Sequence, residues 1–153
     1  MSKPSASQSA YLALSDALAP AFAAIGYPDF GRNVSALSDL VAVPAGGRMF
    51  ATLRDAGVTV EDVQLSPRTY ELAVRADLEL IVSESDDEAR DASFDLALVA
   101  VDDALEADRM LGETVADVEI EGLDPIDLDI EGAPPVKGAI LKIRMLVTSD
   151  RPF

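Results

Sequence analysis

The 153-residue sequence contains no cysteine, no histidine and no tryptophan. The absence of cysteine excludes disulfides, thiolate catalysis and metal sites with sulfur ligands. The absence of histidine removes the most common general base and the most common metal ligand. What stays open is chemistry based on carboxylates, on serine, lysine or tyrosine, or on oxygen ligands for a hard cation.

Basic residues are also scarce. Lys and Arg together number 12 and Asp and Glu 28, so the formal net charge at pH 7 is −16. A protein that binds nucleic acid tightly needs clustered basic side chains to release counterions. We therefore expect this chain to repel DNA. Three explanations of the acidity stay open: a halophilic source, simple solubility, or a passage through which DNA slides without binding.

Hydrophobic runs are short. No apolar run approaches the ~20 residues that span a bilayer, and the N-terminus "MSKPSASQSAYLALSDALAP" lacks the continuous apolar stretch of a signal peptide. We expect a soluble protein made in the cytoplasm, with no membrane partner. The length and an apolar fraction of 49%, of which little is aromatic, predict one domain over residues 1–153 with a core of Leu, Val, Ile and Ala.

Two segments have the period of an amphipathic helix. Residues 9–26 carry one apolar stripe, with a glycine placed to end the helix: Tyr11, Leu14, Leu18, Phe22, Ile25 and then Gly26. The second helix carries the stripe Phe94, Leu98, Val101 and Leu105. Ser85 and Glu88 have the spacing of a capping box at its start. Arg109 is predicted in its last turn and Gly112 just after its end.

Three segments have the period of a half-buried strand: residues 68–82, 115–123 and 135–149. Residues 48–57 are predicted as a short strand that ends in a turn. The clearest is 68–82, in which apolar and charged residues alternate. Burying every apolar stripe requires the helices to cover one face of the sheet. The predicted fold class is α+β: an antiparallel sheet of about four strands with two helices packed on one face, in the order α-β-β-α-β-β.

Between the first helix and the first strand, residues 27–47 have no period and mix Pro, Gly, Asn and Ser with apolar residues. The segment is too apolar for a solvated linker, so we predict a long loop or arm that packs on its own body or on a neighbour. Its apolar residues are candidates for an oligomer interface: Val34, Leu37, Leu40, Val41 and Val43.

The polar face of the predicted sheet is a second candidate surface. Its charged residues are Glu71, Arg75, Asp77, Glu79, Lys142 and Arg144. Its bases are isolated among acids, so we expect them to form ion pairs across neighbouring strands.

The stretch "DLDIEGAPPVKG", residues 127–138, begins like a calcium-binding EF-hand loop. Its acids and first glycine occupy loop positions 1, 3, 5 and 6: Asp127, Asp129, Glu131 and Gly132. Position 12, where a bidentate Glu belongs, is Gly138, and Pro134 and Pro135 interrupt the loop. We interpret the stretch as an extended segment that enters a turn before the last strand. No Gly-x-Ser-x-Gly or Ser-x-x-Lys motif is present, so we predict no catalytic residue, no metal site and no cofactor.

Three phrases, in this order, resemble the tail terminator proteins of long-tailed bacteriophages and related gene transfer agents: "SPRTYELAVRADLELIV", "ARDASFDLALVAVDDALEADRMLGETVADVEIEG" and "EGAPPVKGAILKIRMLVTSDRP". The resemblance covers about residues 48–153, and the N-terminal helix by position only. The long apolar segment 27–47 departs from the family pattern.

The resemblance implies a structural virion protein. Its copies would form a ring, commonly a hexamer, that caps the tail tube, ends tube polymerisation and contributes to joining tail and head. The implied partners are the chain itself, the tail tube protein and a head–tail connector protein, with DNA passing through without specific binding. The implied location is the virion tail, after assembly in the host cytoplasm, and the apolar residues of 27–47 would contact the tube or a neighbouring copy.

Three alternatives stay open. The first is another virion protein, either a different head–tail connector such as a stopper or a tube protein. The second belongs to another class, an acidic domain that binds calcium or a small ligand. The third is a housekeeping domain from a halophilic source.

Overall fold

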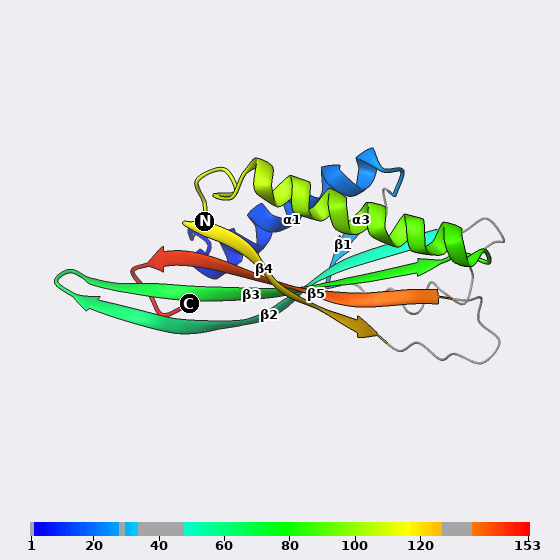
Figure 1. Cartoon of the computed structure of the whole chain (residues 1–153). Helices are drawn as coiled ribbons and strands as arrows, with labels where there is room; N and C mark the ends of the chain where they lie inside the picture. The colour runs from blue at the N-terminus through cyan, green and yellow to red at the C-terminus, as the bar shows by residue number, and fades with distance from the viewer. Residues whose placement is uncertain (1, 28–29, 34–47, 127–135) are drawn as a thin grey trace.

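The computed structural model describes residues 2–27, 30–33, 48–126 and 136–153. The elements follow one another as α1 (Ala6–Ala24), β1 (Phe30–Arg32), β2 (Arg48–Leu65), β3 (Arg68–Ser83), α3 (Asp87–Ala107), β4 (Asp117–Ile126) and β5 (Val136–Ser149). Two helices and a sheet make an α+β fold, with the helices lying along one side of the strands (Figure 1).

The sheet has five strands in the order β1-β2-β3-β5-β4 and is mixed. β1 pairs with β2 in parallel, and the other three pairings are antiparallel. The prediction of about four antiparallel strands was therefore incomplete, because β1 lies within the segment predicted as a loop. A strand of three residues is too short to show a period. Its first residue, Phe30, stacks on Phe22 of α1 with ring centroids 5.4 Å apart.

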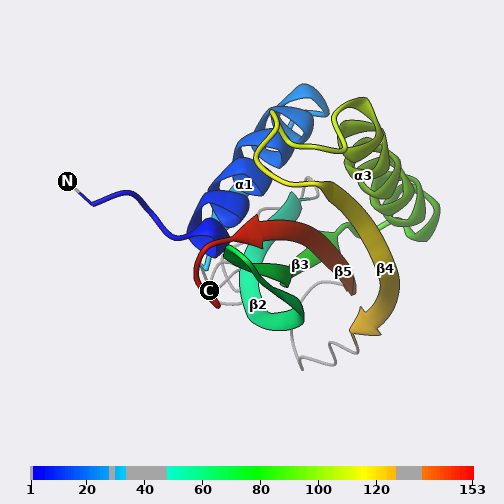
Figure 2. The same cartoon turned by 90° about the vertical axis from the view of Figure 1, so that its left-hand side faces the viewer.

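Both helices cover the same face of the sheet (Figure 2). α1 begins with Ser5 as its N-cap, whose side chain accepts a hydrogen bond from the backbone N–H of Gln8. The predicted end of this helix is confirmed: Gly26, directly after the C-cap Ile25, has a φ of 88°, which glycine adopts without strain.

The ends of α3 differ from the prediction. Its N-cap is Asp86 rather than Ser85, because the Asp86 carboxylate accepts a hydrogen bond of 2.8 Å from the backbone N–H of Ala89. The helix ends at Ala107, before Gly112, so Arg109 lies outside it.

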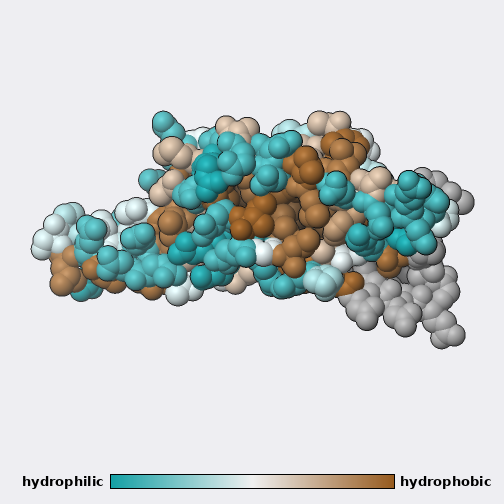
Figure 3. All heavy atoms as spheres, viewed as in Figure 1, coloured by the Kyte–Doolittle hydropathy of each residue, from teal (hydrophilic) through white to brown (hydrophobic). Residues whose placement is uncertain are grey.

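β2 is longer than the predicted strand 48–57. At Gly57 the φ is 106°, and the pairing with β3 shifts between Asp55 and Val58, but the strand then continues to Leu65. β2 and β3 thus form a long hairpin that projects past the helices (Figure 1). Hydrophobic side chains are visible on its projecting end, and a second hydrophobic area lies at the middle of the same view (Figure 3).

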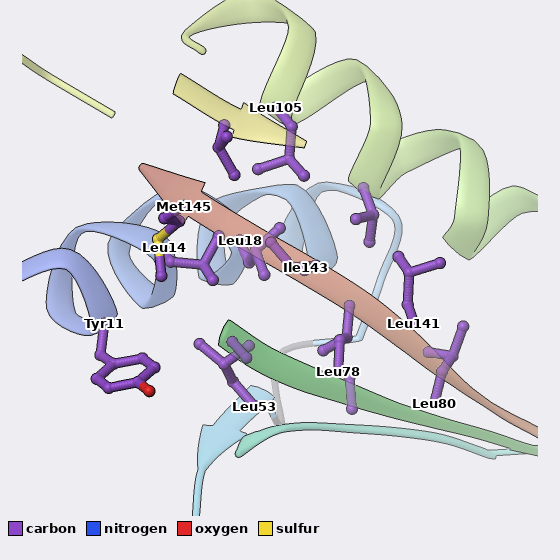
Figure 4. Packing of buried hydrophobic residues seen from close by; sticks show 14 of the residues in the cluster. Tyr11, Leu14, Leu18, Leu53, Leu78, Leu80, Leu105, Leu141, Ile143 and Met145 are labelled. Carbon is purple, nitrogen blue, oxygen red and sulfur yellow. The ribbon is translucent and has the colours of Figure 1, made fainter. Parts of the chain in front are cut away.

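The core lies between the helices and the sheet. Leucine, isoleucine and methionine side chains from both layers point toward one another there, among them Leu14, Leu18, Leu53, Leu78, Leu105, Leu141, Ile143 and Met145 (Figure 4). Each fully buried aliphatic side chain contributes about 1.5–3 kcal/mol relative to an exposed one. The core is therefore aliphatic, as the composition predicts.

Two predictions concern residues outside the described ranges. The candidate interface residues Val34, Leu37, Leu40, Val41 and Val43 lie outside the described residues, and so do 127–135 of the calcium-loop-like stretch.

In the part that is described, no helix is both long enough and apolar enough to cross a membrane.

Candidate functional site

The candidate site is the face of the sheet that points away from the helices. β3 contributes Glu71, Arg75, Asp77 and Glu79 to this face, and β5 contributes Lys142 and Arg144. These six residues are the ones that the sequence assigned to the polar face. Their alternation places them opposite the buried positions of the same strands, such as Leu78 and Ile143.

Two arginines form the centre of this face. Arg75 of β3 and Arg144 of β5 are direct partners in the antiparallel register. Like charges at opposed positions destabilise a sheet unless something compensates them. Two glutamates do so. Glu61 lies 3.8 Å from Arg75 and 3.9 Å from Arg144, and Glu121 lies 3.7 Å from each of them.

Both bridging glutamates come from irregular points in the outer strands. The pairing of β2 with β3 shifts between Val60 and Asp62, which leaves Glu61 as the extra residue. The pairing of β4 with β5 shifts between Ile120 and Gly122, which leaves Glu121 as the extra residue. A β-bulge bends its strand and redirects a side chain. One bulge on each side of the arginine pair therefore supplies one carboxylate.

Further ion pairs extend the network along the face. Arg144 also contacts Glu119 at 3.2 Å, and Lys142 contacts Asp77 at 3.2 Å. Arg54 contacts Glu79 at 2.9 Å. Glu71 is exposed and forms no ion pair with the described part of the chain. The expected cross-strand ion pairs of Arg75, Lys142 and Arg144 are thus present.

The network is partly exposed to water. The side chain of Arg144 keeps 21% of its accessible surface, and those of Arg75, Glu61 and Glu121 keep 36–37%. At this exposure each ion pair contributes modestly to the stability of the fold. Beside it lies a hollow of about 170 Å³, lined by charges of both signs: Arg75, Asp77, Glu121 and Lys142, with Ala56, Ala76 and Ile143.

This face is not polar throughout. Phe50 of β2 and Ile81 of β3 are partners in the register, and both are buried although they point away from the helices. Neither belongs to the main core cluster. The face therefore has a charged middle and an apolar end.

A separate ion pair lies at the start of β4. Arg109 donates hydrogen bonds of 2.8 and 3.0 Å to the two carboxylate oxygens of Asp117. These hydrogen bonds lower the pKa of Asp117 below its ordinary value and raise that of Arg109. The pair links the turn after α3 to the edge strand.

On the helix side, Tyr11 connects α1 to two strands. Its hydroxyl donates to the backbone carbonyl of Arg75 at 2.9 Å and approaches that of Gly57 at 3.3 Å. Burial raises the pKa of Tyr11 above its ordinary value. The guanidinium of Arg32 lies over its ring, 5.2 Å from the centroid.

Glu61 is not among the residues predicted for the polar face, because the first strand was predicted to end at Gly57. A signal for it exists. The apolar residues Val58 and Val60 keep one phase of alternation, whereas Val63 and Leu65 have the other. A change of phase within a strand indicates an inserted residue, and Ile120 and Leu123 show the same change around Glu121.

Among the residues that the structure describes, no three acidic side chains gather so that they could hold a metal ion. No family model matches the chain, and no curated protein matches its sequence.

Proposed function

We propose that this chain is a tail terminator, a structural protein whose copies close into a ring on the end of a tail tube, stop its growth and contribute to joining the tail to the head. The observation that carries the proposal is the β2–β3 hairpin. It projects past the helices and exposes Val60, Val63 and Leu65. Clustered exposed apolar side chains favour a protein partner, because burying them in a contact lowers the free energy relative to leaving them in water.

The charge of the chain supports the proposal. A net charge of −16 opposes adhesion of DNA to the surface. The acids of the sheet's polar face are largely neutralised by Arg54, Arg75, Lys142 and Arg144, whereas Asp95, Asp102 and Asp103 on α3 make no ion pair within the described ranges. The repulsive charge thus lies mainly on other surfaces than the sheet face.

The β4 edge of the sheet is unsuited to association through an added strand. β4 is an edge strand that carries a bulge at Glu121 and a proline at Pro125. Bulges, charges and prolines on an edge oppose pairing with another strand. A ring of this protein would therefore not form by adding a strand at the β4 edge.

A tube-capping assay tests the proposal. The tail tube protein of the same particle is allowed to polymerise with and without the purified chain, and the products are imaged by electron microscopy. We expect shorter tubes that end in a ring at one end. Tubes that grow equally long without any ring at their ends would refute a terminator. Polymerisation of the chain by itself would support a tube protein instead.

Calorimetric titration with calcium tests the alternative that belongs to another class of protein, an acidic calcium-binding domain. A terminator gives no binding heat at micromolar calcium. Binding heat that disappears in Asp129→Asn would support an acidic calcium-binding domain, because Asp129 occupies the third position of the loop-like stretch.

A further inference from the structure

The projecting part of the β2–β3 hairpin has two unlike faces. Cross-strand partners share a face, so the register places Val60 with Leu72, Val63 with Tyr70 and Leu65 with Arg68 on the helix side. The other face is polar, with Asp62 opposite Glu71 and Gln64 opposite Thr69. The helix-side face continues the apolar stripe of the core beyond the helices. We call it the hairpin face, made of Val60, Val63, Leu65, Arg68 and Tyr70.

The hairpin face is most exposed at its end. Val60 and Val63 keep 40% and 39% of their accessible surface, and Leu65 keeps 72%. From Val60 to Leu65 the strand extends about 17 Å at ~3.4 Å per residue. The only charged residue of this face, Arg68, forms no ion pair with any residue in the described ranges. The hairpin face thus combines an apolar surface with one unused positive charge.

A second surface, apolar like the hairpin face but with the opposite charge, lies on α3. Leu96 and Val99, each 49% exposed, are three residues apart and therefore neighbours on the outer side of the helix. Asp95 and Asp103 lie four residues before and after Val99, both exposed. Within the described residues neither acid has an ion-pair partner. We call this set the α3 patch: Leu96, Val99, Asp95 and Asp103.

We propose that the hairpin face of one copy packs on the α3 patch of the next copy. The apolar residues would then bury one another, and Arg68 would lie against Asp103. A contact between two different surfaces of the same chain is heterologous, and repeated heterologous contacts form a closed ring when the rotation between subunits closes. The inference rests on the proposed function, for which it supplies the contact between subunits.

Charge complementarity favours the α3 patch as the partner of the hairpin face. Two hairpin faces packed on each other would bring two Arg68 side chains to a face that carries no carboxylate among its described residues. α1 offers a poorer acceptor surface, because Leu12 is its only large exposed hydrophobic residue. The α3 patch has two exposed apolar side chains and two acids within about two and a half turns of helix.

Cysteine cross-linking tests the contact directly, since the chain has no cysteine of its own. In the full chain we combine Leu65→Cys with Val99→Cys and oxidise the protein at high concentration. We expect a ladder of covalent multimers, because each copy would bond to the next. The matched control combines Gln64→Cys, on the opposite face of the same hairpin, with Val99→Cys. Equal ladders from both pairs, or none from the Leu65 pair, would overturn the proposal.

A charge exchange between two exposed positions, Arg68 and Asp103, gives a second measurement. Arg68→Asp weakens self-association, measured by light scattering or sedimentation, by about tenfold or more, and Asp103→Arg does the same. The variant with both changes recovers the original association, because the two charges are exchanged across the contact. Failure of the double variant to recover would refute the pairing of Arg68 with Asp103.

The two proposals fail separately. Rings that depend on the hairpin face but do not cap tubes would refute the terminator function and leave the contact standing. Capped tubes whose rings are unchanged by Arg68→Asp would refute the contact and leave the function standing. Protein that stays monomeric and uncross-linked, both alone and on tubes, would refute the contact.

Discussion

Arg75 and Arg144 face each other across β3 and β5, and Glu61 and Glu121 lie between them from either side at 3.7–3.9 Å. The sheet thus contains an opposed pair of like charges that depends on carboxylates from two other strands. Removing either carboxylate leaves the arginine pair with one bridging glutamate, while Arg144 keeps its contact with Glu119. The network therefore couples β2 and β4, which do not touch as neighbours in the sheet.

We expect Glu121→Gln to destabilise the protein by about 0.5–1 kcal/mol, because it removes a charge shared by two arginines. The loss is measured by urea unfolding and shrinks at high salt, which screens the pairs. The control is Asp124→Asn on the same strand, an exposed acid without an ion-pair partner in the described part of the chain. Equal losses from both variants would contradict the role of Glu121.

Tyr11→Phe is expected to cost about 1–2 kcal/mol of unfolding free energy. The substitution removes the hydroxyl that donates to the carbonyls of Arg75 and Gly57 and leaves the ring in place. Tyr70→Phe is the matched control, since the Tyr70 hydroxyl has no hydrogen bond with any described residue. Urea unfolding of the two variants side by side gives the comparison, and a Tyr11→Phe protein as stable as the control would disprove the role of the hydroxyl.

The same tyrosine predicts a loss of stability at alkaline pH. The pKa of Tyr11 is raised by burial, so the folded state favours the neutral phenol. Its contribution is complete below the unfolded pKa of about 10 and is lost as the pH rises through the higher folded pKa. The pH dependence of the unfolding midpoint measures it. In Tyr11→Phe the decline above pH ~10 becomes shallower, and an unchanged decline would exclude this residue as its source.

Asp117 predicts an effect at the other end of the pH scale. The hydrogen bonds from Arg109 lower the pKa of Asp117 in the folded state. Its stabilising contribution is present above the unfolded pKa of about 4 and is lost as the pH falls through the lower folded value. Asp117→Asn is therefore less stable than the parent at neutral pH, and the difference between the two proteins narrows on acidification. A difference that stays constant from neutral to acidic pH would contradict this ion pair.

Gly57 and Gly122 offer a matched test of backbone strain. Both have open space where a Cβ would lie, but only Gly57 has a positive φ, of 106°. Gly57→Ala is expected to cost about 1–2 kcal/mol, because an L-residue adopts this conformation only under strain. Gly122→Ala has no such penalty. Thermal or urea unfolding compares the two variants, and equal stabilities would refute the assigned cause.

The sequence predicts the parts of this fold that have a long, constant period. β3 was predicted at 68–82 and lies at Arg68–Ser83, because one face is buried along most of its length. β2 was predicted too short, because Gly57 resembles the end of a strand and the apolar phase changes at Glu61. β1 has only three residues, so its pairing with β2 and the stacking of Phe30 on Phe22 decide its structure.

The ion-pair network of the candidate site is likewise predictable only in part. The alternation of β3 and β5 predicts that Arg75 and Arg144 share a face. Their direct opposition depends on the register between strands distant in sequence. The alternation within each strand fixes which face a residue takes, but it does not fix which residues of that face are opposite each other. The bridging glutamates depend in addition on the two bulges. The network was therefore predictable in composition but not in geometry.

The central position of β3 has a consequence for how the chain folds. β2 and β3 meet through the turn between Leu65 and Arg68, so this pairing closes only a short loop. β3 meets β5 only after the chain has passed through α3 and β4, with Tyr70 opposite Ser149. Closing the longer loop costs more chain entropy and slows formation of the contacts that it brings. The backbone hydrogen bonds between β2 and β3 are therefore expected to acquire protection from hydrogen exchange before those between β3 and β5.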